Sequence, residues 1–196
     1  MNQANSRFLF LLCRTRRLGN SEQLAYCAAH PLPPGTEQQW LHLLDFPLPD
    51  FVDMRHSGSF NLPVGNAQLL LEATLNATDV VLVAPLYWYG LPAPAKLYLD
   101  HWSAWLRMPG INFRDRMQRK NLWAIAVSSG ERTDAQPLED SLTLTANYLH
   151  MRWGGMLFGT GSRPNDIQLD APALHRAKSF FAASAAAAPS TGPYGD

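Results

Sequence analysis

Residues 79–100 read Asp79-Val-Val-Leu-Val-Ala-Pro-Leu-Tyr-Trp-Tyr-Gly-Leu-Pro-Ala-Pro-Ala-Lys-Leu-Tyr-Leu-Asp100. The apolar, β-branched run at 80–84 predicts a strand covered on both faces, as in a parallel sheet. Pro85 ends this strand. We expect a helix at 93–106, with Pro92 just before it and Pro94 in its first turn, where proline is tolerated. Three aromatic residues and a glycine lie between strand and helix. They occupy the carboxyl end of the strand, where open α/β sheets bind their ligands.

Strand-like and helix-like segments alternate along the rest of the chain. We expect strands at 8–13, 40–44, 122–127 and 156–159, and helices at 20–29, 66–77, 137–151 and 171–187. This alternation predicts an α/β fold with a parallel sheet and helices on both faces. Five strands favour a doubly wound sheet of order 2-1-3-4-5. With 196 residues, the chain is expected to form a single domain at 1–187 and a flexible C-terminal tail at 188–196.

Charge and hydropathy give no sign of a macromolecular or membrane partner. Lys+Arg and Asp+Glu both number 16, so no basic surface predicts nucleic-acid binding. No apolar run approaches the roughly 20 residues of a membrane span, and we expect a cytoplasmic protein. Cys13 and Cys27 lack C-x-x-C spacing and are interpreted as two reduced thiols in the core. The six histidines lack the spacing of metal ligands, so no metal site is expected.

The helix expected at 93–106 carries more apolar side chains than one core contact uses. Its stripe consists of Ala95, Leu99, Trp102 and Leu106, and Tyr98 and Trp105 lie beside that stripe. The helix therefore has either a wide core face or a second apolar face that contacts another copy of the chain. On the second interpretation we predict a homodimer whose functional site lies near the subunit boundary.

Three loops should meet at one edge of the sheet, because the carboxyl ends of parallel strands share an edge. The loop at 14–21 combines hydroxyls and guanidinium groups with the start of a helix, which favours phosphate binding, although an ordinary helix cap fits as well. The loop at 85–90 offers rings for stacking, unless its aromatics serve only for packing. The loop at 128–131 offers backbone N–H groups that a ligand can approach closely. Together these properties describe a site for flavin mononucleotide (FMN), and the candidate cofactor-binding residues are Arg14, Thr15, Arg16, Gly19, Asn20, Ser21, Pro85, Leu86, Tyr87, Trp88, Tyr89, Gly90, Ser128, Ser129, Gly130 and Glu131.

From about residue 8 to residue 181, the chain resembles the NAD(P)H-dependent FMN reductases of the flavodoxin-like superfamily. Residues 16–21 resemble the later part of that family's Ser-x-Arg-x-x-Gly-Asn-Thr/Ser phosphate loop, residues 85–100 its flavin-ring loop and helix, and residues 128–130 its Ser/Thr-Ser-Gly loop. Two positions depart from the family pattern. Arg14 stands where the family has a phosphate-binding serine, and His101 stands where it has an arginine.

The resemblance implies a flavodoxin-like fold and an enzyme that uses FMN and NAD(P)H. Hydride would pass from the nicotinamide to FMN, and electrons would then pass to a small acceptor such as a quinone, a nitro or azo compound, or free flavin. No catalytic acid or base is expected, because the flavin carries the chemistry. Two alternatives are a flavodoxin-type electron carrier that acts with a protein partner and a flavin-free interaction module. The balanced charge argues against the acidic docking face that is typical of such carriers.

Overall fold

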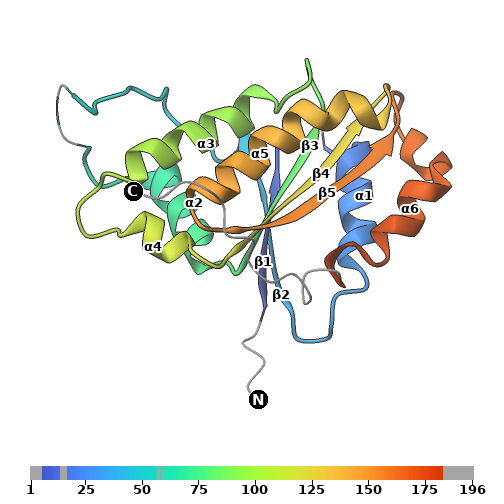
Figure 1. Cartoon of the computed structure of the whole chain (residues 1–196), viewed down its shortest axis with the longest axis horizontal. Helices are drawn as coiled ribbons and strands as arrows, with labels where there is room; N and C mark the ends of the chain where they lie inside the picture. Colours follow the sequence, from blue (N-terminus) through green and yellow to red (C-terminus); the bar gives the residue numbers. More distant parts are fainter. Residues whose placement is uncertain (1–5, 14–16, 57, 59, 183–196) are drawn as a thin grey trace.

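The computed structural model describes residues 6–13, 17–56, 58 and 60–182. Its centre is an all-parallel, five-stranded sheet in the order β2-β1-β3-β4-β5, as predicted (Figure 1). The strands are β1 (Arg7–Leu12), β2 (Glu37–His42), β3 (Asp79–Pro85), β4 (Asn121–Ser128) and β5 (Arg152–Thr160). The α-helices are α1 (Asn20–Ala29), α2 (Gly65–Asn76), α3 (Ala93–Trp105), α4 (Phe113–Met117), α5 (Gln136–Tyr148) and α6 (Ala171–Ala177). Short 3-10 helices are η1 (Leu43–Asp45), η2 (Arg132–Ala135) and η3 (Asp166–Leu169), and residues 180–182 also form a 3-10 turn.

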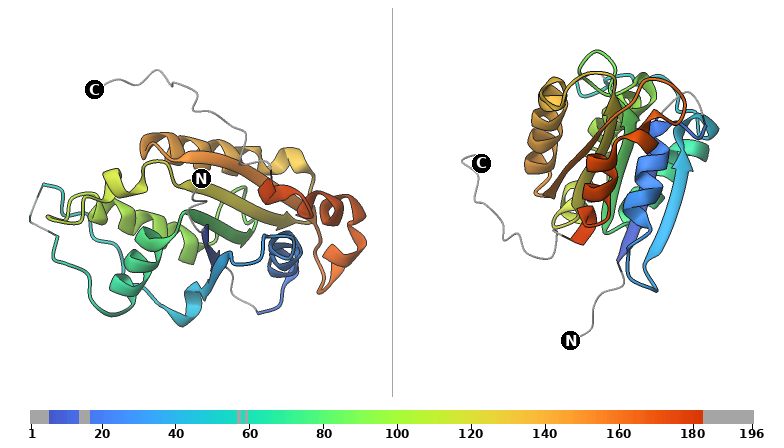
Figure 2. Two further views of the ribbon diagram at one scale, coloured as in Figure 1. Left: turned by 90° about the horizontal axis from the view of Figure 1, so that it is seen from below. Right: turned by 90° about the vertical axis from the view of Figure 1, so that its right-hand side faces the viewer.

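The central strand β3 is covered on both faces, as its apolar run predicts. Val80 and Leu82 belong to the core that lies beneath α2, α3 and α5, whereas Val81 and Val83 belong to the core beneath α1 and α6. Helices α1 and α6 lie side by side on their face of the sheet (Figure 2). The alternation of side chains along one strand thus divides the protein into two cores. None of the helices in the described part of the chain is long and apolar enough to cross a membrane.

The core face of α3 differs from the predicted stripe, and this removes the basis of the homodimer prediction. Tyr98 and Trp105 are fully buried, whereas Leu99 and Leu106 are only partly buried. The Tyr98 hydroxyl lies 2.5 Å from Thr74 Oγ1 on α2, so this ring can enter the core without leaving a polar atom unpaired. Tyr98 also makes edge contacts with Trp102 and Trp105. The helix therefore has a wide core face, and its aromatic residues give no support for a contact between subunits.

Two further predictions need correction. Cys27 is exposed and does not belong to the core, because it lies outside the face of α1 that buries Leu24, Ala25 and Ala28. Cys13 is buried as predicted, and burial raises its pKa to about 12, so this thiol is inert at neutral pH. The last helix was expected to reach residue 187, but α6 ends at Ala177. After the turn that follows α6, the rings of Phe180 and Phe181 both pack against Trp123. Residue 187 and the predicted tail lie outside the described residues.

The sequence patterns also underestimated the lengths of four strands, β2, β3, β4 and β5, and missed α4. The largest differences are in β5, which begins four residues before the predicted start at 156, and in β2, which occupies Glu37–His42 in place of 40–44. Two glycines at 152–155 and exposed polar residues at 37–39 weaken the strand pattern at these positions. Helix α4 has only five residues, so its two buried side chains, Phe113 and Met117, give too short a pattern to recognise.

His101, which departs from the family pattern, has a structural role. Its ring nitrogen Nε2 donates a hydrogen bond to the carbonyl oxygen of Pro49 at 2.9 Å, and its ring lies against Phe51. Asn66 at the start of α2 donates to the carbonyl oxygen of Pro47 at 3.0 Å. These contacts attach the irregular segment between η1 and α2 to the helical layer.

A buried polar cluster at the amino ends of the strands is centred on Asp79, which is 4% exposed. Its Oδ1 accepts hydrogen bonds from Asn121 Nδ2 at 2.6 Å and from Trp123 Nε1 at 3.0 Å. Its Oδ2 accepts a hydrogen bond from Thr78 Oγ1 at 2.7 Å. The cluster joins β3 to β4 at the edge of the sheet that lies opposite the candidate ligand-binding edge.

Replacement of Asp79 tests this cluster. In Asp79→Ala, two buried donors lose their acceptor, and we expect the free energy of unfolding to fall by about 3 kcal/mol in urea titrations. Asp79→Asn is the matched control: its Oδ1 can still accept both bonds, and its Nδ2 can donate to Thr78, which has a second acceptor in the Arg7 carbonyl. We expect a much smaller loss in this variant. Equal losses would mean that the charge, and not the acceptor, stabilises the fold.

Candidate functional site

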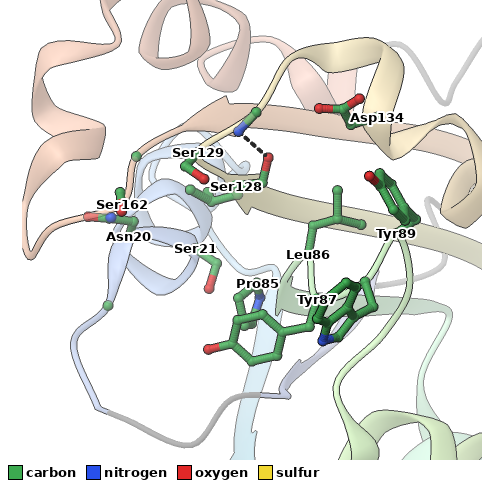
Figure 3. Close-up of a pocket in the computed structure, with 15 residues that line it drawn as sticks. Asn20, Ser21, Pro85, Leu86, Tyr87, Tyr89, Ser128, Ser129, Asp134 and Ser162 are labelled. Carbon is green, nitrogen blue, oxygen red and sulfur yellow. Dashed lines mark hydrogen bonds between the residues drawn. The ribbon is translucent and has the colours of Figure 1, made fainter.

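A cleft of about 650 Å³ opens at the carboxyl edge of the sheet (Figure 3). It brings together residues from all three predicted loops, together with residues that follow β5. The lining residues are Gly19, Asn20, Ser21, Pro85, Leu86, Tyr87, Trp88, Tyr89, Val127, Ser128, Ser129, Gly130, Asp134, Gly161 and Ser162. Asn20 and Ser162 lie at one end of the cleft, and Tyr89 and Asp134 lie at the other.

The amino end of α1 presents backbone N–H groups to the cleft. Gly19 is the N-cap and contributes no side-chain cap, and the first hydrogen bond of the helix runs from Gln23 N–H to the Gly19 carbonyl oxygen. Among the described residues, no partner is recorded for the N–H groups of Gly19, Asn20 and Ser21. Ser21 lines the cleft opposite Pro85 and Tyr87 (Figure 3). N–H groups at a helix start that have no partner among the described residues form a suitable site for an anion such as phosphate.

The side chain of Asn20 holds this helix end in place. Its Nδ2 donates to the carbonyl oxygen of Arg163 at 2.9 Å, and its Oδ1 accepts from Ile167 N–H at 3.4 Å. Gly161 permits this contact, because a Cβ at that position would lie 2.8 Å from Asn20 Nδ2. Asn20 therefore joins α1 to the loop after β5 and also lines the cleft. One of its two Nδ2 hydrogens bonds the Arg163 carbonyl oxygen, so its side chain fixes the helix end.

The aromatic loop is a tight turn with an unusual backbone. Tyr87 and Gly90 exchange two backbone hydrogen bonds of 3.1 and 3.0 Å, and the two residues between them have φ angles of 49° (Trp88) and 63° (Tyr89). This is the geometry of a type I′ turn, whose central positions normally hold glycine or asparagine. The rings of Tyr87, Trp88 and Tyr89 are 51%, 95% and 57% exposed. The turn thus holds large rings in solvent at the mouth of the cleft, at a cost in backbone strain.

The loop after β4 is held by hydrogen bonds of its own. Ser128 Oγ accepts from Gly130 N–H at 3.0 Å (Figure 3). Asp134 Oδ2 accepts from Glu131 N–H at 3.1 Å. The amide of Ser129 has no recorded partner in the described part of the chain, so it is the donor that this loop offers to a ligand. Glu131 caps η2 and does not line the cleft.

The structure places the remaining predicted residues as follows. Gly90 closes the aromatic turn but does not line the cleft. Arg14, Thr15 and Arg16 lie outside the described residues. Four lining residues were not predicted: Val127, Asp134, Gly161 and Ser162. Gly161 and Ser162 directly follow the fifth strand, so they could have been predicted in the same way as the other loops, from their place at the carboxyl end of a parallel strand. Asp134 lies six residues after the end of β4, and its position in the sequence gives no such indication. No group of His, Cys, Asp and Glu side chains in the described ranges is arranged to hold a metal ion.

Comparison with known proteins agrees with this geometry. A family model described as NADPH-dependent FMN reductase matches residues 6–156. The chain belongs to this family. It is therefore an NAD(P)H-dependent oxidoreductase with FMN as its cofactor. A relative in Bacillus subtilis, described as an NAD(P)H-dependent FMN-containing oxidoreductase, is 30% identical over 166 residues, which cover 83% of this chain and 90% of the relative.

Two solved structures have the same fold as this reductase. The Trp repressor binding protein of Bacillus subtilis has a TM-score of 0.72 and 25% identity, and the match covers 89% of this chain and 97% of that protein. An NAD(P)H:quinone oxidoreductase of Methanothermobacter marburgensis has a TM-score of 0.71 and 14% identity, with 96% and 100% covered. The resemblance recognised from residues 85–100 is thus confirmed at the level of family and fold.

The residues of the cleft fit FMN chemically. The N–H groups at the start of α1 suit a phosphate, and the Ser129 amide and the exposed rings suit a flat, polar heterocycle. The volume is within the range of small-molecule and cofactor sites. When bound, FMN supplies the ability to accept a hydride and to pass on electrons, and the protein supplies binding and orientation.

The strained turn yields a test that separates fold from function. Trp88→Gly and Trp88→Ala both remove a ring that is 95% exposed, but only glycine removes the steric cost of the positive φ. We expect the FMN-free Gly variant to exceed the Ala variant by about 1 kcal/mol in free energy of unfolding, with the Ala variant close to wild type. We expect both to change NADPH-dependent acceptor reduction more than they change FMN affinity.

Calorimetry and steady-state kinetics measure these two effects. A large loss of apoprotein stability in Trp88→Ala with unaltered kinetics would assign Trp88 to packing and exclude it from the site.

Proposed function

We propose that FMN lies in this cleft with its phosphate at the amino end of α1 and its isoalloxazine ring between the 86–89 and 128–130 loops. The observation that carries the proposal is the continuity of the cleft. It joins helix N–H groups that have no partner in the described part of the chain to a slot between two loops at the other end. The orientation of FMN follows from the chemistry of the two ends of the cleft, because the described residues offer several convergent donors for an anion at the α1 end.

In this arrangement each part of the site has one task. Ser21 and the α1 amides hold the phosphate, and Arg14, Thr15 and Arg16 are proposed to complete that subsite. Pro85 and Leu86 border the ring, and Tyr87, Trp88 and Tyr89 lie at the entrance, where they limit the access of water and contact the incoming nicotinamide or acceptor. Ser129 donates its amide to the polar edge of the ring. These residues bind and orient; none is required to transfer a proton.

The same entrance is proposed to serve both half-reactions. A reduced nicotinamide would occupy it first and a small acceptor would take its place afterwards, with bound FMN supplying the hydride and electron chemistry between them. The exposed aromatic rings favour flat acceptors such as quinones and nitro or azo arenes, with free flavin as a further candidate. The similarity in fold to a quinone oxidoreductase makes quinones the first acceptors to test. We further propose that the protein acts in the cytoplasm.

An anaerobic spectroscopic experiment tests this proposal. The purified protein, reconstituted with FMN, should show flavin absorbance that NADPH or NADH bleaches and that a quinone or azo dye then restores. FAD should bind more weakly, because a phosphate held by the α1 amides is terminal in FMN but not in FAD. An FMN-loaded protein that neither nucleotide reduces would instead be a one-electron carrier. A protein that binds no FMN would contradict the proposed function.

We also propose a homodimer, on grounds different from the core helix α3. Three exposed aromatic rings lie together at the mouth of the cleft, and an exposed apolar surface of this kind is typical of contact sites. A second copy at this surface would place the entrance beside the subunit boundary. Light scattering at micromolar concentration should give about twice the chain mass of 21.8 kDa. A mass of one chain, with and without FMN, would rule out the dimer.

A further inference from the structure

Asp134 is the one charged side chain among the described residues that line the cleft. It lies in η2, at the end of the cleft that also holds Tyr89 (Figure 3). The basic residue of the same short helix, Arg132, forms an ion pair with Glu139 of α5. Within the described part of the site, nothing therefore offsets the negative charge of Asp134.

The position of this carboxylate is fixed by the loop around it. Oδ2 accepts the Glu131 N–H at 3.1 Å, and the Glu131 side chain in return caps the backbone at the third position of η2. The carboxylate also lies close against Gly130, where an added Cβ would be only 2.3 Å from Oδ2. Because Oδ1 has no recorded partner among the described residues, it can accept a hydrogen bond from a ligand in the cleft.

We propose that Asp134 lowers the reduction potential of the bound FMN. This inference rests on the proposed placement of the ring at the Tyr89 end of the cleft. Hydride transfer from NAD(P)H carries two electrons and one proton to the ring and leaves NAD(P)⁺, so the charge on the ring falls by one unit. A fixed carboxylate beside the ring opposes this gain of negative charge more than it opposes binding of the oxidised form. The residue thereby favours electron transfer onward to the acceptor.

The electrostatic effect can be separated from the structural one. Asp134→Asn retains an oxygen that can accept the Glu131 N–H and removes only the charge. Asp140→Asn is the matched control, because Asp140 lies exposed on α5, hydrogen-bonds Gln136 and is absent from the cleft lining. Asp134→Glu restores the charge with a longer side chain and tests for rescue.

The measurement is the midpoint potential of the FMN-loaded protein, equilibrated anaerobically with reference dyes. In Asp134→Asn we expect the affinity for reduced FMN to rise about tenfold relative to that for oxidised FMN, which raises the two-electron potential by about 30 mV. Asp140→Asn should match the wild-type potential, and Asp134→Glu should lie nearer to wild type than to Asp134→Asn.

Each other outcome overturns the inference. An unchanged potential in Asp134→Asn, or an equal shift in Asp140→Asn, shows that the charge of Asp134 does not act on the flavin. The proposed function still stands in that case if the protein binds FMN and oxidises NADPH. An equal loss of affinity for both redox forms in Asp134→Asn assigns the residue to loop structure. If the wild-type protein binds no FMN, both the inference and the proposed function fail.

Discussion

The burial of β3 on both faces is the constraint on which the rest of the molecule depends. Residues 80–84 are at most 1% exposed, and their side chains alternate between the two cores. A strand buried in this way needs helices on both sides, and parallel neighbours supply them through their crossover connections. Because all five strands run in one direction, the loops that follow four of them, β1, β3, β4 and β5, meet at one edge and enclose the cleft.

Stability and ligand binding are concentrated at opposite ends of this sheet. At the amino ends, Asp79 satisfies buried donors of β4 and closes the polar cluster. At the carboxyl ends, three amides at the start of α1 and the amide of Ser129 have no hydrogen-bond partner among the described residues. Such donors and the positive φ angles of Trp88 and Tyr89 weaken the fold locally. A bound cofactor that accepts these hydrogen bonds would recover part of that cost.

The loop after β5 links the cleft to the helical layers. Asn20 bonds to the backbone of that loop, and Gly161 permits the close approach. The orientation of the α1 amides therefore depends on residues about 140 positions away in the chain. In the same way, the Tyr98 hydroxyl depends on Thr74 of α2, so a polar atom of α3 is satisfied by a neighbouring element. Such pairings determine which side chains remain available for a ligand.

The sequence by itself determined the sheet order, the family and the three loops that converge on the site. Those properties depend on local patterns: an apolar run at 80–84, prolines near a helix start, and short motifs next to strand ends. Tertiary structure decided what each side chain does there. Helical spacing assigned Leu99 to the core stripe and left open whether Tyr98 and Trp105 face the core or a partner. The hydrogen bond to Thr74 and the edge contact between the two rings accompany the burial of both aromatics. The roles of Asn20 and Asp134 also depend on contacts between distant segments. Nothing near them in sequence records that Asn20 reaches the β5 loop or that a turn of η2 brings Asp134 into the cleft, because contacts between distant segments exist only once the chain has folded.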